Sequence, residues 1–164
     1  MSKEEAKTLV LGGVLRRIGN FEPDLFLTSF DARLVLQKTI YLMQAFGLYL
    51  GFKFSWYLRG PYSPMLAHNG YELAKMKRKV PLVRFARAKS ERRFKEFLGF
   101  LGSKKNDAEW VEILASIHLL RRLYPGKRKN AILRLVAKKQ PIFSIQKCTE
   151  AWNHLERHDL IGEE

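Results

Sequence analysis

Apolar residues recur at the spacing of an amphipathic helix along most of the chain. This spacing predicts helices over residues 3–18, 65–76, 90–101, 107–123 and 127–139, and one more that begins after Ser144. Residues 30–50 differ, because apolar groups occupy most faces and the polar residues Arg33, Gln37 and Gln44 fall on one stripe. A helix of this kind is typical of the centre of a fold. We therefore expect the other helices to pack around residues 30–50.

Short segments between these helices carry other signals. Residues 52–59 combine aromatic content with rough alternation, which suits a short strand better than a helix. We expect a small β-hairpin or short strands that pair residues 52–59 with residues 81–86. Residues 20–27 contain a proline and are predicted to form a loop, and Gly60-Pro61 is predicted to turn the chain.

A glycine pair, Gly12-Gly13, lies inside the first predicted helix. Glycine in a helix interior costs about 1 kcal/mol relative to alanine. The pair therefore indicates a kink or a close approach of another segment to the helix backbone.

The composition fits one mainly α-helical domain over residues 1–164. The chain is 46% apolar and 12% aromatic, enough for a packed core, and it shows no repeat or low-complexity linker. The single cysteine, Cys148, excludes an internal disulfide and favours a reducing compartment. Polar side chains within residues 30–50 argue against a membrane span, and the first residues do not resemble an export signal. We expect a cytoplasmic protein without a membrane contact.

The formal net charge of +14 is concentrated in two segments. Residues 75–95 hold ten basic side chains and one acid, a net +9, and residues 121–139 hold eight and none, a net +8. Such charge attracts phosphate backbones, and a solvated basic surface is the alternative. If the two basic segments lie on one face of the fold, a single groove for a polyanion is favoured. If they lie on opposite faces, such a groove is unlikely. The predicted nucleic-acid contacts are Lys77, Arg78, Lys79, Arg84, Arg87, Arg121, Arg122, Lys127, Arg128, Lys129, Arg134 and Lys138.

The last two predicted helices, joined by a short turn, resemble the helix-turn-helix portion of winged-helix regulators. Glu150 and Glu156 on the second helix disfavour DNA readout there, so the basic helix before it is the better candidate for contact. A plain packing unit is the alternative.

Motifs of catalysis are absent from the sequence. It contains no phosphate-binding GxxxxGK[ST] loop, no GxSxG and no HExxH. Glu150, His154 and His158 share a helix face, but no further ligand cluster accompanies them, so we interpret them as surface side chains and predict no metal. Cys148 falls on an apolar stripe and is interpreted as a buried structural thiol. We predict no cofactor, and catalysis is unsupported.

Residues 56–64 are the most distinctive part of the sequence, with three aromatic residues, one arginine and a GPYSP turn. As a binding surface, Trp56, Tyr57, Arg59 and Tyr62 would offer ring faces and a guanidinium to a partner. As a structural feature, the segment would join a strand to a helix and bury its rings. Both interpretations remain open.

Two runs, QKTIYLMQAFGL from Gln37 and FSWYLRGPYS from Phe54, resemble the YwgA-like proteins of bacteria and archaea over residues 30–76. More distantly, the helix with Lys38 and Tyr41 and the Gly-Pro turn that follows resemble the SocA-like (Panacea) antitoxin domain. That resemblance implies a protein-binding module and assigns no catalytic residue.

These observations favour a non-enzymatic, nucleic-acid-associated regulatory protein that binds phosphate through the two basic segments. The alternative is an antitoxin-like adaptor that binds a partner protein through the FSWYLRGPYS surface. An unrecognised nuclease or other enzyme is the third hypothesis and ranks last.

Overall fold

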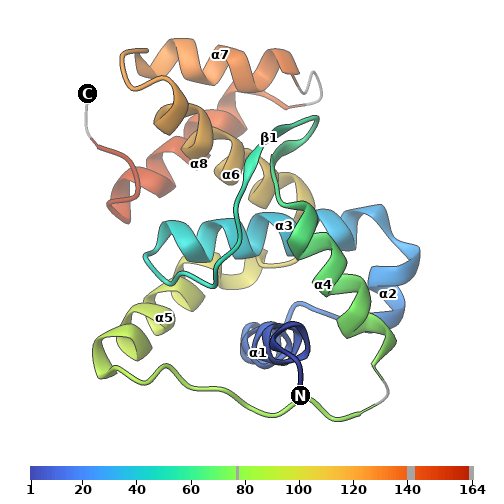
Figure 1. The fold of residues 1–164 in the computed structure, drawn as a ribbon. Helices are drawn as coiled ribbons and strands as arrows, with labels where there is room; N and C mark the ends of the chain where they lie inside the picture. The colour runs from blue at the N-terminus through green and yellow to red at the C-terminus, as the bar shows by residue number, and fades with distance from the viewer. Residues whose placement is uncertain (77, 140–142, 163–164) are drawn as a thin grey trace.

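Eight helices and one hairpin make up the computed structural model in the residues that it describes, which are 1–76, 78–139 and 143–162. The mainly α fold predicted from the sequence is confirmed (Figure 1). The helices are α1 (Lys3–Ile18), α2 (Pro23–Thr28), α3 (Phe30–Ala45), α4 (Pro64–Lys75), α5 (Ala88–Leu101), α6 (Ala108–Leu123), α7 (Lys129–Lys139) and α8 (Ile145–Arg157). A 3-10 turn, η1 (Gly102–Lys104), follows α5.

Helix α3 runs through the middle of the molecule, as predicted. It packs against α6 on one side and against α2 and α4 on another, and α7 and α8 cover α6 (Figure 1). Its last residue is Ala45 rather than residue 50, because Gly47 adopts a φ of 88° that ends the helix. The Gln44 side chain then holds the departing chain, since its Oε1 accepts the N–H groups of Leu50 and Phe52, each at 3.1 Å.

The predicted strand pairs with a different segment from the one expected. Strand β1 (Ser55–Tyr57) pairs antiparallel with β2 (Gly60–Tyr62), and Trp56 lies opposite Pro61. The turn therefore falls at residues 58–59, before Gly60. Residues 81–86 are extended but do not pair with β1. Alternation of side chains along a strand indicates the strand but not its partner.

The loop predicted over residues 20–27 is also corrected, because α2 occupies most of it. Pro23 is the first residue of α2, where its missing N–H costs no hydrogen bond. The Glu22 side chain caps the helix by accepting the N–H of Leu25 at 2.8 Å. The proline begins a helix here, and does not interrupt one.

The glycine pair of α1 marks a close approach, and α1 continues through it. An extended segment of residues 78–87, here called the strap, passes over α1 at this point (Figure 1). A Cβ on Gly13 would lie 2.6 Å from Val83 Cγ1 and 2.9 Å from the Pro81 carbonyl oxygen. Arg16 and Arg17 of α1 also donate hydrogen bonds to strap carbonyls. Helix and strap fit together because neither glycine has a side chain.

The last two helices form a packing unit with α6. The Ser144 hydroxyl caps α8 as predicted, by accepting the N–H of Lys147. Cys148, Trp152 and Leu155 on α8 are fully buried, which confirms that the Cys148 thiol lies in the core. In the part of the chain described, no helix combines the length and apolarity needed to cross a lipid bilayer.

Candidate functional site

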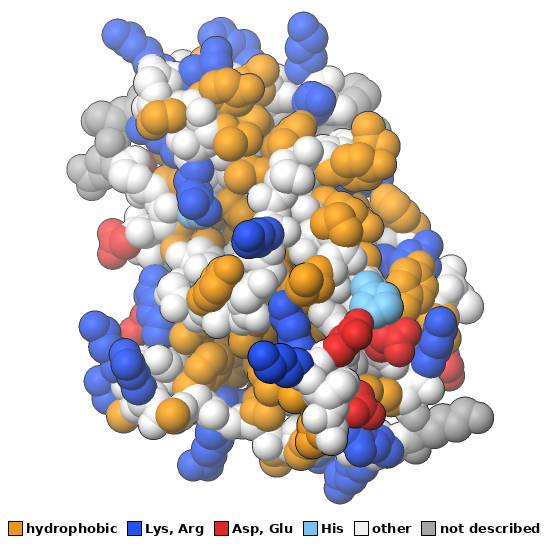
Figure 2. Space-filling view, viewed as in Figure 1, with side chains coloured by type: hydrophobic (Ala, Val, Ile, Leu, Met, Phe, Trp, Pro, Cys, Tyr) orange, Lys and Arg blue, Asp and Glu red, His pale blue; other side chains and the backbone are white. Residues whose placement is uncertain are grey.

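The two basic segments lie at opposite ends of the molecule. The strap and α5 form one end and α7 forms the other, with α3 between them (Figure 1). Figure 2 shows Lys and Arg side chains at the top of this face and along its lower part, with others between them. The two segments therefore do not line one short groove.

At the lower end, the predicted contacts Arg78, Lys79, Arg84 and Arg87 are exposed on the strap, and Lys77 lies outside the described residues. The single acid of this segment, Glu91, is turned to α1, where its two oxygens accept Arg17 guanidinium N–H groups at 2.6 and 2.8 Å. These bonds, together with one from the Phe85 N–H, hold the pKa of Glu91 at about 2. The ion pair of Glu91 is thus with Arg17 of α1, and not with a basic side chain of the strap.

At the upper end, most of the predicted contacts project from α7 and from the loop before it. Arg121 binds the backbone of that loop, since its Nη1 donates hydrogen bonds to the carbonyls of Pro125 and Lys127 at 3.1 and 2.7 Å. Lys129 is half-buried and its Nζ lies 3.5 Å from Asn153 Oδ1. The remaining contacts are exposed, namely Arg122, Lys127, Arg128, Arg134 and Lys138.

The hairpin residues divide between two places. Tyr57, Arg59 and Tyr62 line a pocket of about 300 Å³ between the hairpin, α3 and α4. Trp56 does not line it, and lies instead beside α7, where the Nζ of Lys139 is 5.7 Å from its ring centre. Three of the four predicted partner-binding residues are thus brought together.

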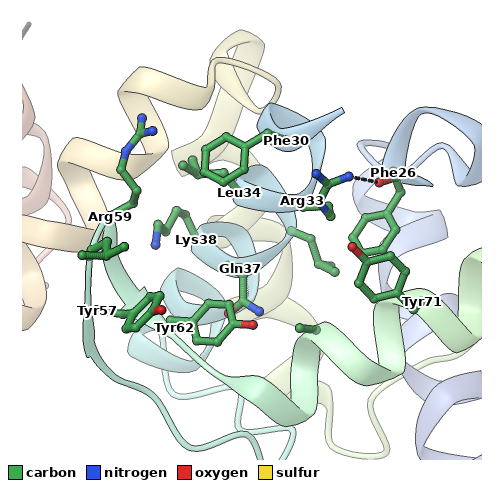
Figure 3. A pocket seen from close by; sticks show the side chains of 14 residues that line it. Phe26, Phe30, Arg33, Leu34, Gln37, Lys38, Tyr57, Arg59, Tyr62 and Tyr71 are labelled. Carbon is green, nitrogen blue, oxygen red and sulfur yellow. Dashed lines mark hydrogen bonds between the residues drawn. The ribbon is translucent and has the colours of Figure 1, made fainter. Parts of the chain in front are cut away.

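Five aromatic residues line the pocket (Figure 3). Tyr57 and Tyr62 stand on one side, with ring centres 5.3 Å apart, and Phe26 and Tyr71 stand on the other, 5.1 Å apart. Phe30 lies at the rim, 54% exposed. Exposed rings around a hollow are typical of a binding surface.

Polar groups of α3 fix the hairpin beside this pocket. The buried Gln37 amide donates to the Ser63 carbonyl and accepts the Ser63 N–H, both at 2.9 Å. The Lys38 ammonium donates to the Pro61 carbonyl at 2.6 Å. Gly60 has a φ of 95°, and a Cβ there would lie 2.4 Å from the Ser116 hydroxyl. Much of the GPYS turn therefore has a structural role, in agreement with the structural interpretation of this segment.

A buried ion pair underlies the pocket. Glu112 on α6 is fully buried, and its Oε1 lies 2.7 Å from Arg59 Nη2, while Arg59 is 37% exposed. Burial raises the pKa of Glu112 and Arg59 opposes that rise. Burial lowers the pKa of Lys38 to about 8, Glu112 partly offsets the shift, and Arg59 adds to it. Lys38 thus remains mostly protonated at neutral pH.

Sequence reasoning did not assign several lining residues to a site, among them Phe30, Arg33, Lys38 and Tyr71. One signal for them was present, because Arg33 and Gln37 belong to the polar stripe of the otherwise apolar residues 30–50. A polar side chain on a buried helix needs a partner, and here the partners are backbone groups of segments folded onto α3.

The C-terminal histidines differ from the prediction that they are surface side chains. His154 is half-buried and stacks on Phe100, with ring centres 4.5 Å apart, and its Nε2 lies 2.8 Å from the Phe100 carbonyl oxygen. His158 packs edge-on against the same ring. Across the described ranges, no group of three or more His, Cys, Asp or Glu side chains is placed to hold a metal ion.

Comparison with protein-family models, curated proteins and solved structures finds no match. The resemblance to YwgA-like and SocA-like proteins therefore stays a prediction from the residues that suggested it.

Proposed function

We propose that this protein is a non-enzymatic binding module that holds a segment of a partner protein at its hairpin and pocket. The observation that supports the proposal is the convergence of Tyr57, Arg59 and Tyr62 on one aromatic pocket. Tyr57 is 57% exposed and Phe30 is 54% exposed. Aromatic and arginine side chains around a hollow are the groups that most often dominate the energy of protein contacts.

The size of the pocket favours a side chain of a partner over a large cofactor. Its volume of about 300 Å³ is at the lower end of the range for ligand pockets. Leu58 at the hairpin tip is 72% exposed and extends the apolar surface beyond the pocket. An antitoxin-like adaptor would use this same surface.

A tyrosine substitution tests this proposal better than an arginine substitution, because Arg59 also neutralises the buried Glu112. A tagged chain is used to capture its partner from the native cell, and the purified pair is then measured by calorimetry. Tyr57→Ser should weaken the complex at least tenfold, a typical effect for an aromatic contact residue. Tyr49→Ser is the matched control, because Tyr49 is 67% exposed and does not line this pocket. Equal loss in both variants, or capture of nucleic acid without protein, would contradict the proposal.

We also propose a second candidate, phosphate contact at the basic ends, which the orientation of Glu91 favours. That carboxylate forms its ion pair with Arg17 of α1, and among the described residues it forms none with an arginine or lysine of the strap. Because the ends are far apart, each contributes its own contacts, and a long nucleic acid would have to cross the molecule to reach both.

Salt dependence tests this second candidate at each end separately. For duplex DNA, log affinity should fall with log salt at a slope of about −0.9 per phosphate contact. Arg134→Gln/Lys138→Gln removes charge at α7, and Arg84→Gln/Arg87→Gln removes it at the strap. Each pair should flatten the slope if its end takes part. Binding that is absent, or insensitive to salt, near physiological salt would refute phosphate contact.

A further inference from the structure

The pocket between the hairpin, α3 and α4 carries an unbalanced charge. Three cationic side chains line it, Arg33, Lys38 and Arg59, and none of its other lining residues is acidic. Glu112 neutralises one of the three from behind Arg59. With that ion pair counted, the lining retains two positive charges beside its aromatic walls.

Two of these cations, Arg33 and Lys38, have N–H groups beyond those used in the hydrogen bonds of the described residues. Arg33 is half-buried, and the structure records one hydrogen bond from its guanidinium, donated by Nη1 to the Phe26 carbonyl at 3.0 Å. Lys38 uses one N–H for the Pro61 carbonyl, and an ammonium has three. Figure 3 shows Arg33 on one side of the space and Lys38 on the other, with the aromatic rings around them.

Besides these cations, the polar side-chain groups of the lining are the Gln37 amide and three tyrosine hydroxyls. The Gln37 amide is bound at both its nitrogen and its oxygen by the backbone of Ser63. It therefore offers little to a neutral polar ligand. A cationic ligand would meet Arg33 and Lys38 and find no carboxylate among the lining residues. The lining thus matches an anionic group that is attached to an apolar body.

We infer that the pocket recognises an acidic segment of the partner, in which one large apolar side chain enters the aromatic walls and a neighbouring carboxylate meets Arg33, with Lys38 adding positive charge across the pocket. This inference rests on the proposed function and adds the chemistry of the partner. A carboxylate gains a charge-assisted hydrogen bond from the Arg33 guanidinium, which is stronger than a bond between neutral groups. The apolar side chain gains from leaving water for the rings.

The test uses two probes that differ in charge, hydrocinnamate and its neutral amide, each titrated into the full chain. Binding is followed through backbone amide shifts in heteronuclear NMR spectra. We expect hydrocinnamate to shift signals of α3, α4 and the hairpin and to bind about tenfold more tightly than the amide, the effect of one charge-assisted hydrogen bond. Arg33→Gln should remove most of this difference, and Arg78→Gln on the strap should keep it.

Equal binding of the two probes, binding of the acid elsewhere, or an unchanged ratio in Arg33→Gln would overturn the inference. The proposed function is decided separately by capture of the partner. A partner that is lost in Tyr57→Ser but bound equally well by Arg33→Gln would leave the proposed function standing and refute the acidic segment. A short single-stranded oligonucleotide that displaces hydrocinnamate in the full chain, and binds more tightly than an acidic peptide with one tryptophan, would also refute it.

Discussion

Replacing Arg59 by methionine should cost much more stability than its partial exposure suggests. The guanidinium contacts Glu112 through Nε at 2.9 and 3.1 Å and through Nη2 at 2.7 Å. Without Arg59, the fully buried carboxylate loses its hydrogen-bonded partner. Removal of one member of a buried ion pair typically costs about 3–5 kcal/mol. We expect Arg59→Met to lower the free energy of unfolding by that amount at about pH 8.

The loss should depend on pH, with a sign that follows from Glu112. Burial already raises the pKa of this carboxyl group, and Arg59 holds the pKa down. In Arg59→Met the folded state therefore binds a proton at a pH where the unfolded state does not, and stability falls as pH rises. The destabilisation should be smaller at about pH 5 than at about pH 8.

Urea unfolding followed by circular dichroism measures both quantities. The double variant Arg59→Met/Glu112→Gln should recover most of the lost stability and remove the additional pH dependence, because the buried carboxylate is no longer present. Arg128→Met is a control at an exposed arginine, and a change within about 0.5 kcal/mol is expected there. A loss below about 1 kcal/mol for Arg59→Met, the range of exposed ion pairs, would refute the reasoning.

Three further predictions concern other parts of the fold. Burial lowers the pKa of His118 to about 4, so stability should fall as pH drops from about 6.5 to 4, by up to about 3 kcal/mol. Urea unfolding across this range should show a smaller fall in His118→Gln than in the unsubstituted chain, and an equal fall would contradict the burial argument. Gly13→Ala should displace the strap, even though alanine has the better helix propensity, and the displaced strap should be cleaved faster by trypsin at Arg84. A variant that is more stable and equally resistant to trypsin would contradict the close approach of the strap to α1. Gly60→Ala combines a positive φ with contact against a serine hydroxyl, so it should cost about 1–3 kcal/mol in a thermal melt, and an unchanged melting temperature would contradict that contact.

Helical periodicity was sufficient to predict most of the fold. It placed α1 at its observed bounds and identified residues 30–50 as central, because a helix with apolar groups on most faces is buried on most sides. It missed α2, since a proline at a first helical position resembles one in a loop. It also chose the wrong partner for β1, because pairing depends on a positive φ at Gly60 and on contacts with α3.

The candidate site was predicted only in part, because some of its residues come together only through contacts between distant segments. The hairpin aromatic residues were recognisable as a cluster in the sequence. Arg33, Lys38 and Tyr71 join them only when α3 and α4 fold against the hairpin. The distance between the basic segments likewise depends on the path of the chain around α3. Local composition contains no information on either arrangement.

The polar side chains of α3 bind the backbone of neighbouring segments, and this has a consequence for variation. Gln37, Lys38 and Gln44 form hydrogen bonds with backbone N–H and carbonyl groups. Every residue has these backbone groups, except that proline has no N–H. Most side chains at the tip of the hairpin can therefore be exchanged without loss of these bonds. The framework is suited to grafting, in which residues 57 and 58 are randomised to select new binding specificities, while Arg59 is kept because it pairs with the buried Glu112.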